Sequence, residues 1–190
     1  MTMWPWEHLA FGYLLYSGYL RMVHGRRTGD DEAIALVVGT QFPDLVDKPL
    51  AWALGILPGG LSLAHSVLFF IPICVLLFVA SGRHPTSAFC VGYGSHLLGD
   101  VIYPLATGGG LDVSFLLWPL VTRIPSDTRG LVGNVVYYTD QFVVFLGTPR
   151  GQVYLLAELL LLLLVIGLWA TDGFPGPAAL RDRLHRPKSR

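Results

Sequence analysis

The segment Val153–Ala170, VYLLAELLLLLLVIGLWA, decides the class of protein to which this chain belongs. Glu158 is its only acidic or basic residue. A helix rises about 1.5 Å per residue, so roughly 20 apolar residues cross the hydrocarbon core of a bilayer, whereas buried strands are much shorter. The segment is therefore predicted to be a membrane-spanning helix.

The composition of the whole chain agrees with a membrane protein. Of its 190 residues, 53% are hydrophobic and 14% are charged, and the mean hydropathy is +0.55. Soluble domains carry about 25% charged residues. The net charge is zero, which gives no information about nucleic acid, and no nucleic-acid partner is evident from the sequence. Cys74 and Cys90 lie in apolar runs, which favours small packing residues over a disulfide.

Further apolar segments predict more helices, at about residues 7–23, 31–57, 61–80, 86–105 and 131–147. Residues 111–120 are apolar but short, and we expect an interfacial or re-entrant piece there. Pro43 lacks an N–H donor and disfavours helix at Phe42, which predicts two half-helices within 31–57. The expected fold is an all-α, polytopic integral membrane bundle of about four to five transmembrane helices, one interrupted near Pro43.

The basic residues predict an orientation in the cell membrane. We divide the chain into a helical transmembrane domain, residues 1–172, and a basic tail, residues 173–190, expected to be cytoplasmic. With five crossings, the tail side also holds loops 24–30 and 81–85. Arg21, Arg26, Arg27, Arg83, Arg181, Arg183, Arg186, Lys188 and Arg190 then lie inside, and Lys48, Arg123, Arg129 and Arg150 lie outside. This asymmetry follows the positive-inside rule for a multi-pass protein.

Six ionisable side chains lie in apolar surroundings, where each costs several kcal/mol by typical scales. They are His8, Asp44, Asp47, His65, His96 and Asp100. Residues three or four apart share a helix face, so the two pairs Asp44/Asp47 and His96/Asp100 can each direct two ligands to one point. The orientation derived from Arg and Lys alone places all six in the outer half of the bilayer. They are predicted to form one shared site.

Imidazole and carboxylate ligands together favour a divalent metal ion, with zinc preferred and manganese or iron as the alternatives for a more oxygen-rich site. A cation also neutralises carboxylates that are costly to bury. Each residue alone has a simpler interpretation. His8 can be an interfacial residue, Asp44 can cap a half-helix, and His65 with Ser66 can form an interhelical hydrogen-bond pair.

The segments that carry these residues resemble the YdjM-like family of inner-membrane proteins, also described as LexA-binding, inner-membrane-associated metal-dependent hydrolases. The resemblance covers about His8 to Pro104. It rests on an early helix with His8 and on the segments GTQFPDLVD (39–47), AHS (64–66) and GSHLLGD (94–100). It implies a helical membrane fold, metal-dependent hydrolysis and a distant kinship to zinc-dependent phospholipase C.

Three functions remain open from the sequence. The first is a membrane-embedded metal-dependent hydrolase of a phosphoester or lipid-linked substrate, in which Asp44 and Asp47 are ligands or one of them is the general base. The second is a small transporter or ion-conducting protein that uses the same cluster for protons or cations, which an interrupted helix at Pro43 would suit. The third is a structural protein with a stabilising metal. Membrane lipids are the expected partners, and the oligomeric state is left open.

Overall fold

A computed structural model describes residues 3–81, 83–122 and 129–177, and every regular element within these ranges is helical. This confirms the all-α prediction. In chain order the elements are α1 (Pro5–His24), α2 (Asp30–Lys48), the π-helix η1 (Pro49–Ala53), α3 (Val67–Ala80), α4 (Arg83–Thr107), the 3-10 turn η2 (Ser114–Leu117), α5 (Gly130–Leu146) and α6 (Pro149–Thr171). Of the predicted basic tail, residues 178–190 lie outside the described ranges.

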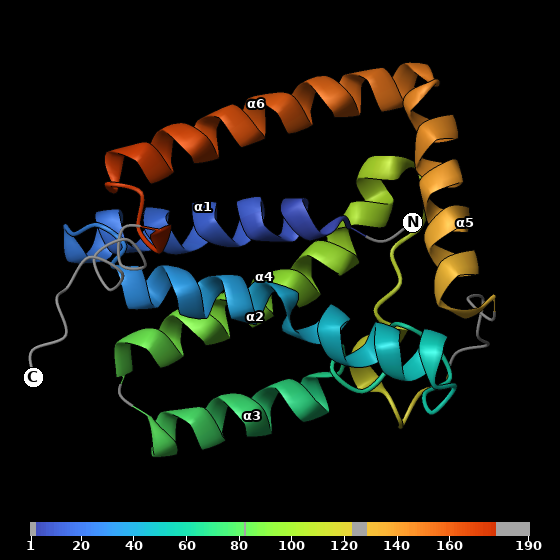
Figure 1. Cartoon of the computed structure of the whole chain (residues 1–190), viewed down its shortest axis with the longest axis horizontal. Helices are drawn as coiled ribbons and strands as arrows, with labels where there is room; N and C mark the ends of the chain where they lie inside the picture. Colours follow the sequence, from blue (N-terminus) through green and yellow to red (C-terminus); the bar gives the residue numbers. More distant parts are fainter. Residues whose placement is uncertain (1–2, 82, 123–128, 178–190) are drawn as a thin grey trace, which may run out of the picture.

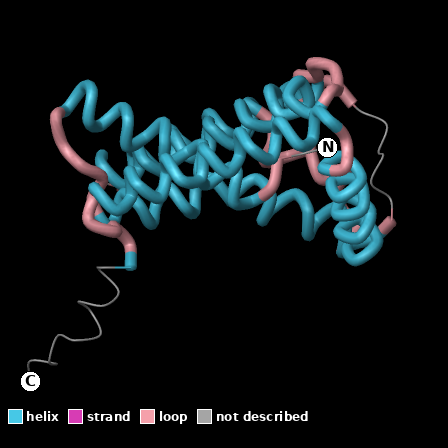
Figure 2. Tube along the Cα trace, turned by 90° about the horizontal axis from the view of Figure 1, so that it is seen from above, coloured by secondary structure: helices cyan, strands magenta, loops and turns pink. Residues whose placement is uncertain are grey.

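The helices form an elongated bundle with one helix across its end. Figure 1 shows α1, α2, α3 and α6 running along the long axis, α4 crossing obliquely between them, and α5 lying across one end. The N-terminus lies at the same end as α5. Figure 2 shows the connecting loops mostly toward the two ends of the bundle. The arrangement gives the molecule two distinct ends, and only one of them is covered by α5.

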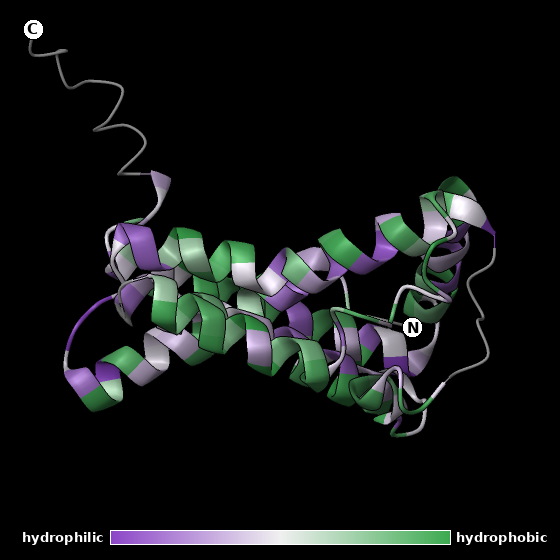
Figure 3. Cartoon of the chain, turned by 90° about the horizontal axis from the view of Figure 1, so that it is seen from below, coloured by the Kyte–Doolittle hydropathy of each residue, from purple (hydrophilic) through white to green (hydrophobic). Residues whose placement is uncertain are grey.

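Apolar side chains cover much of the outer surface of the bundle. Within the described residues, α6 is the helix whose length and hydropathy suit a membrane span. The most apolar part of this helix is not buried inside the bundle. On the shorter α3, Ile71, Val75, Leu76 and Val79 are all more than half exposed. Figure 3 shows hydrophobic residues dominating the helices seen from below. Exposed apolar faces of this kind are typical of surfaces that meet a membrane or another protein.

The prediction of two half-helices at Pro43 is wrong. α2 continues through Pro43 to Lys48, and the regular pattern changes only at η1. Figure 1 shows the axis of α2 changing direction along its length, as expected where a proline removes one helical hydrogen bond and crowds the preceding turn. Pro43 is buried, and α2 packs more extensively against α4 than any other pair of described elements does. Packing therefore keeps the helix continuous around the bend.

The third predicted helix begins later than expected. Its sequence pattern started at Leu61, but α3 begins at Val67 with Ser66 as its N-cap. The Ser66 hydroxyl accepts a hydrogen bond from the Leu68 N–H (3.1 Å) and donates to the carbonyl of Trp118 (2.6 Å). Residues 61–66 are irregular because their N–H groups bond elsewhere, as described below. His65 consequently lies in a loop and not on a helix.

α2 and α4 approach closely because two glycines lie where they cross. A Cβ atom on Gly92 of α4 would lie 2.7 Å from the Leu36 carbonyl oxygen and 3.0 Å from the Thr40 nitrogen, and one on Gly39 would collide with the Phe89 backbone. Small residues at such crossings let helix backbones touch. This contact brings the Thr40 region of α2 against the middle of α4, where His96 lies.

The end of the bundle away from α5 is fastened by polar contacts. The carboxylate of Asp172, just after α6, accepts hydrogen bonds from Tyr13 (2.7 Å), Ser17 (2.7 Å) and Arg21 (2.5 Å) of α1. Burial raises the pKa of Asp172, but these hydrogen bonds and the guanidinium charge outweigh it and hold the pKa below its ordinary value. They tie the last helix to the first one.

Candidate metal centre

Four side chains from α2, α4 and the loop before α3 direct one atom each toward a common point. The Nε2 atoms of His65 and His96 lie 3.1 Å apart. The Oδ2 atom of Asp100 lies 3.4 Å from the first and 3.3 Å from the second. The Oδ1 atom of Asp44 lies 3.5 Å and 3.8 Å from them. The chain thus gathers two imidazoles and two carboxylates that are widely separated in sequence.

These groups are shielded from solvent. His65 and His96 are fully buried, and the Asp100 and Asp44 side chains are 1% and 11% exposed. The Oδ2 atom of Asp100 makes no hydrogen bond to any described residue. A buried carboxylate oxygen without a donor is costly, so it calls for a cation or a proton at this point.

The protonation of the two imidazoles follows from their outer contacts. Nδ1 of His65 lies 2.8 Å from Oδ2 of Asp47, and Nδ1 of His96 lies 2.7 Å from the Thr40 carbonyl oxygen. Both partners are acceptors, so each ring carries a proton on Nδ1, and the neutral form of each ring then presents a lone pair at Nε2. Two lone pairs at 3.1 Å repel each other unless positive charge lies between them. The inward faces of both rings are therefore prepared for a cation.

The spacing of the four atoms suits a tetrahedral metal ion. Zinc–ligand distances of about 2.0–2.1 Å place neighbouring tetrahedral ligands about 3.3 Å apart. The five separations that involve Nε2 of His65 or of His96 run from 3.1 Å to 3.8 Å. The donor set of two nitrogens and two oxygens also matches the chemistry of zinc, with manganese and iron compatible through the carboxylates. The residues present fit a divalent metal without rearrangement of the backbone.

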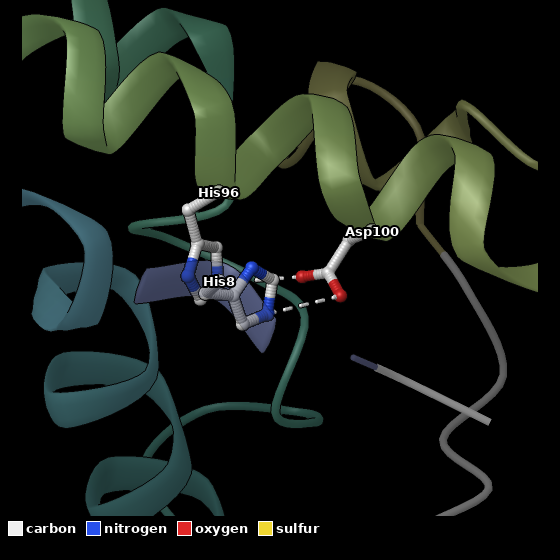
Figure 4. A group of neighbouring side chains, drawn as sticks. All are labelled: His8, His96 and Asp100. Carbon is white, nitrogen blue, oxygen red and sulfur yellow. Dashed lines mark ion pairs between the residues drawn. The ribbon is translucent and has the colours of Figure 1, made fainter. Parts of the chain in front are cut away.

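His8 lies beside this group and forms a second, overlapping one. Its ring stacks on His96 with centroids 3.6 Å apart and planes 13° apart, and its Nε2 lies 3.6 Å from Oδ1 of Asp100. Figure 4 shows the His8 ring over that of His96, with the Asp100 carboxylate directed at both. Neither ring nitrogen of His8 has a hydrogen bond to a described residue. The donor atoms of His8, His96 and Asp100 lie within 4.8 Å of one another, as do those of Asp44, His65 and His96.

Asp47, predicted as a ligand or general base, lies on the far side of His65 from the centre. Its Oδ2 accepts from the N–H groups of Ser62 (2.9 Å) and His65 (3.2 Å), and its Oδ1 accepts from that of Ala64 (2.9 Å). The same Oδ2 faces the imidazole Nδ1. Both oxygens are thus occupied, which explains the irregular backbone of residues 61–66. The geometry makes Asp47 the partner that orients His65.

The structure adds groups that sequence reasoning did not single out. Lys48 donates to Oδ2 of Asp44 (2.5 Å), so that the other oxygen of Asp44 faces the centre. The four-residue spacing of this pair was a readable signal. The backbone N–H of Met3 lies 3.4 Å from Oδ1 of Asp100, and the Thr40 carbonyl orients His96. Backbone contacts of this kind leave no mark in the sequence.

Fold and site together define an all-helical protein of membrane character with a buried His/Asp cluster of the kind that binds divalent metals. The family model described as YdjM inner membrane protein matches residues 3–173. The chain belongs to this family of inner membrane proteins, as its motifs predicted. Comparisons with curated proteins and with solved structures gave no match.

Proposed function

We propose that this protein is a membrane-embedded, metal-dependent hydrolase that acts on a phosphoester or lipid-linked substrate. The observation that carries the proposal is the pair of Nε2 lone pairs, fixed 3.1 Å apart from outside the centre and flanked by two carboxylates. His65, His96, Asp44 and Asp100 hold the divalent metal, with zinc as the first expectation. When bound, the metal lowers the pKa of a coordinated water and polarises the phosphoryl oxygen.

His8 is the group that carries the proton in this proposal. Hydrolysis forms a P–O bond to water, breaks the P–O bond to the leaving alcohol, and moves one proton from the water to the leaving oxygen. Both nitrogens of His8 are without a hydrogen bond to any described residue, and its stacking on His96 fixes the ring next to the centre. Asp100, 3.6 Å away, stabilises the imidazolium that forms.

We further propose a multi-pass arrangement in which α1, α2, α3, α4 and α6 cross the membrane, with α3 as the shortest of them, and α5 lies at its outer surface. The lengths of α1, α2, α4 and α6, from 19 to 25 residues, suit the roughly 20 residues of a crossing. α5 runs across the end of the bundle (Figure 1). Arg21 and Arg26 lie at the opposite end, which supports a cytoplasmic tail and a centre in the outer half of the bilayer.

The transport alternative has less support from the fold. Its main argument was a helix interrupted at Pro43, whereas α2 is continuous there. Interrupted helices expose several backbone groups that coordinate transported ions, whereas Pro43 within a continuous helix deprives only the Gly39 carbonyl of its helical N–H donor. The buried donors in contrast converge on one closed point, as expected for a resident metal.

The metal content of purified protein tests the proposal. Wild type should contain close to one divalent metal per chain, and His96→Ala and Asp100→Asn should lose most of it. His24→Ala is the matched control, because His24 is exposed and contacts Tyr19 far from the centre. Turnover of a phospholipid or a generic phosphomonoester should follow the metal content. Equal, near-zero metal in all four proteins would refute the metal centre, and full metal without turnover of either substrate would refute the hydrolase.

A further inference from the structure

A cavity of 290 Å³ lies between the N-terminal segment, the end of α2 with η1, and α5. Its lining residues Lys48 and Met3 contact Asp44 and Asp100 of the metal centre. Its wall includes Lys48 and the aromatic rings of Trp4, Trp6, Trp52 and Tyr138. Small-molecule sites are mostly apolar concavities of about 300–1,000 Å³ with a few polar groups. At 290 Å³ the cavity lies just below this range, so it has room for part of a lipid and not for a whole one.

Two stacked aromatic pairs form the apolar walls. Trp4 and Trp6 stack with centroids 5.0 Å apart and planes 12° apart, and Trp52 and Tyr138 stack at 5.8 Å and 23°. The pairs come from three different parts of the chain, which fixes a slot that no single element could make. Flat aromatic surfaces with polar edges are typical of membrane interfaces, where one side is apolar and the other is wet.

Two residues that line the cavity contact the carboxylates of the centre. Lys48 reaches Oδ2 of Asp44 at 2.5 Å, and its Nζ also lies 5.5 Å above the Trp52 ring. Met3 lines the cavity, and its backbone N–H lies 3.4 Å from Oδ1 of Asp100. A molecule in the cavity therefore has a cation and the proposed metal ligands at one end and aromatic rings along its sides.

We propose, building on the hydrolase function above, that this cavity binds the substrate as a phosphate amphiphile. The phosphoryl group lies against Lys48 on the cavity side of its contact with Asp44, and the first carbons of the chain lie between the two aromatic pairs. An ammonium group is a strong partner for phosphate oxygens. Pro5, Trp6 and Val135 in the wall are exposed, so the rest of the chain leaves on that side. Free phosphate shares the head group alone and is expected to bind more weakly.

Tryptophan quenching provides a direct test, because three of the five tryptophans line the cavity. The probe is 11-bromoundecyl phosphate in detergent, compared with 11-bromoundecanol and with inorganic phosphate as a competitor. Wild type should show saturable quenching by the phosphate at a concentration about tenfold or more below that for the alcohol. Inorganic phosphate should compete only at much higher concentration, since it lacks the chain.

Two variants separate the head group from the chain. Lys48→Met should reduce the preference for phosphate over alcohol to near one, and Tyr138→Ala should weaken the binding of both brominated probes several-fold. Tyr19→Ala is the control, since Tyr19 is exposed and pairs with His24 at the other end of α1. Equal quenching by both probes in wild type, or unchanged binding in both variants, would overturn the inference. So would competition by inorganic phosphate as strong as that of the amphiphile.

Metal content measured on the same samples distinguishes the two proposals. Protein that holds no metal but prefers the phosphate probe would refute the hydrolase and leave the cavity assignment standing. Protein with full metal content and no preference between the probes would refute the cavity assignment alone.

Discussion

Replacing Asp47 by Asn tests whether the centre depends on a carboxylate that does not face it. The Asp47 side chain is fully buried and accepts hydrogen bonds from three backbone N–H groups and from the His65 imidazole. An amide has one oxygen and one NH₂ group, so one of the two acceptor positions would become a donor that faces another donor. The remaining bonds would lose the help of the negative charge.

The size of the effect follows from these contacts. Hydrogen bonds to a charged group contribute about 1.5–3 kcal/mol and neutral ones about 0.5–1.5 kcal/mol. Weakening the bonds that remain and losing the one to Ala64 should therefore lower the free energy of unfolding by about 3 kcal/mol. His65 would also lose the partner that fixes its tautomer, and such outer-shell changes lower metal affinity by about 10–100-fold.

The assay is a metal competition against a chelator of known affinity, with thermal unfolding in the same detergent. Asp140→Asn is the matched control, because it replaces a carboxylate by an amide in the same way and Asp140 is exposed on α5. The reasoning fails if the Asp47→Asn variant, folded and helical, keeps the metal affinity of wild type. It also fails if the Asp140 control loses affinity to the same extent, since the loss would then reflect charge and not position.

Three further predictions follow from contacts of α1. His8→Ala should keep the metal and lose turnover, and measured loss of the metal would instead make His8 a ligand. Gly12→Ala should lower the free energy of unfolding by about 1–3 kcal/mol, because its Cβ would lie 2.5 Å from Cγ2 of Thr40 and 2.9 Å from Oγ of Ser95, two short and buried side chains. The control Gly18→Ala, with open space around it on the same helix, should be neutral or stabilising by up to about 1 kcal/mol. Because the pKa of Asp172 is held below its ordinary value of 3.8, its carboxylate stabilises the fold above that pH, and the difference in melting temperature between wild type and Asp172→Asn should shrink as the pH falls below it.

The helices were predictable because each is a long apolar run bounded by strong signals. The apolar runs of α1, α4, α5 and α6 placed them within a few residues of their observed bounds. The two errors have a common cause. At Pro43 the local preference against helix is overruled by the packing of α2 along α4, and at residues 61–66 it is the Asp47 carboxylate that draws backbone N–H groups out of a helix. Both depend on neighbours that are distant in sequence.

For the candidate site, too, the sequence indicated which residues take part, whereas the role of each residue depends on its neighbours in the fold. Burying an ionisable side chain is costly wherever it occurs. Ionisable residues within apolar segments therefore singled out six positions, and five of them surround the centre. The role of the sixth, Asp47, depends on which side of His65 it lies. The cavity carried no such signal, because tryptophans and a lysine at a helix end are ordinary in a membrane protein. The contacts of Lys48 with Asp44 and of Met3 with Asp100 join that aromatic slot to the proposed metal ligands, and in our proposal these contacts make the cavity and the metal centre parts of one site.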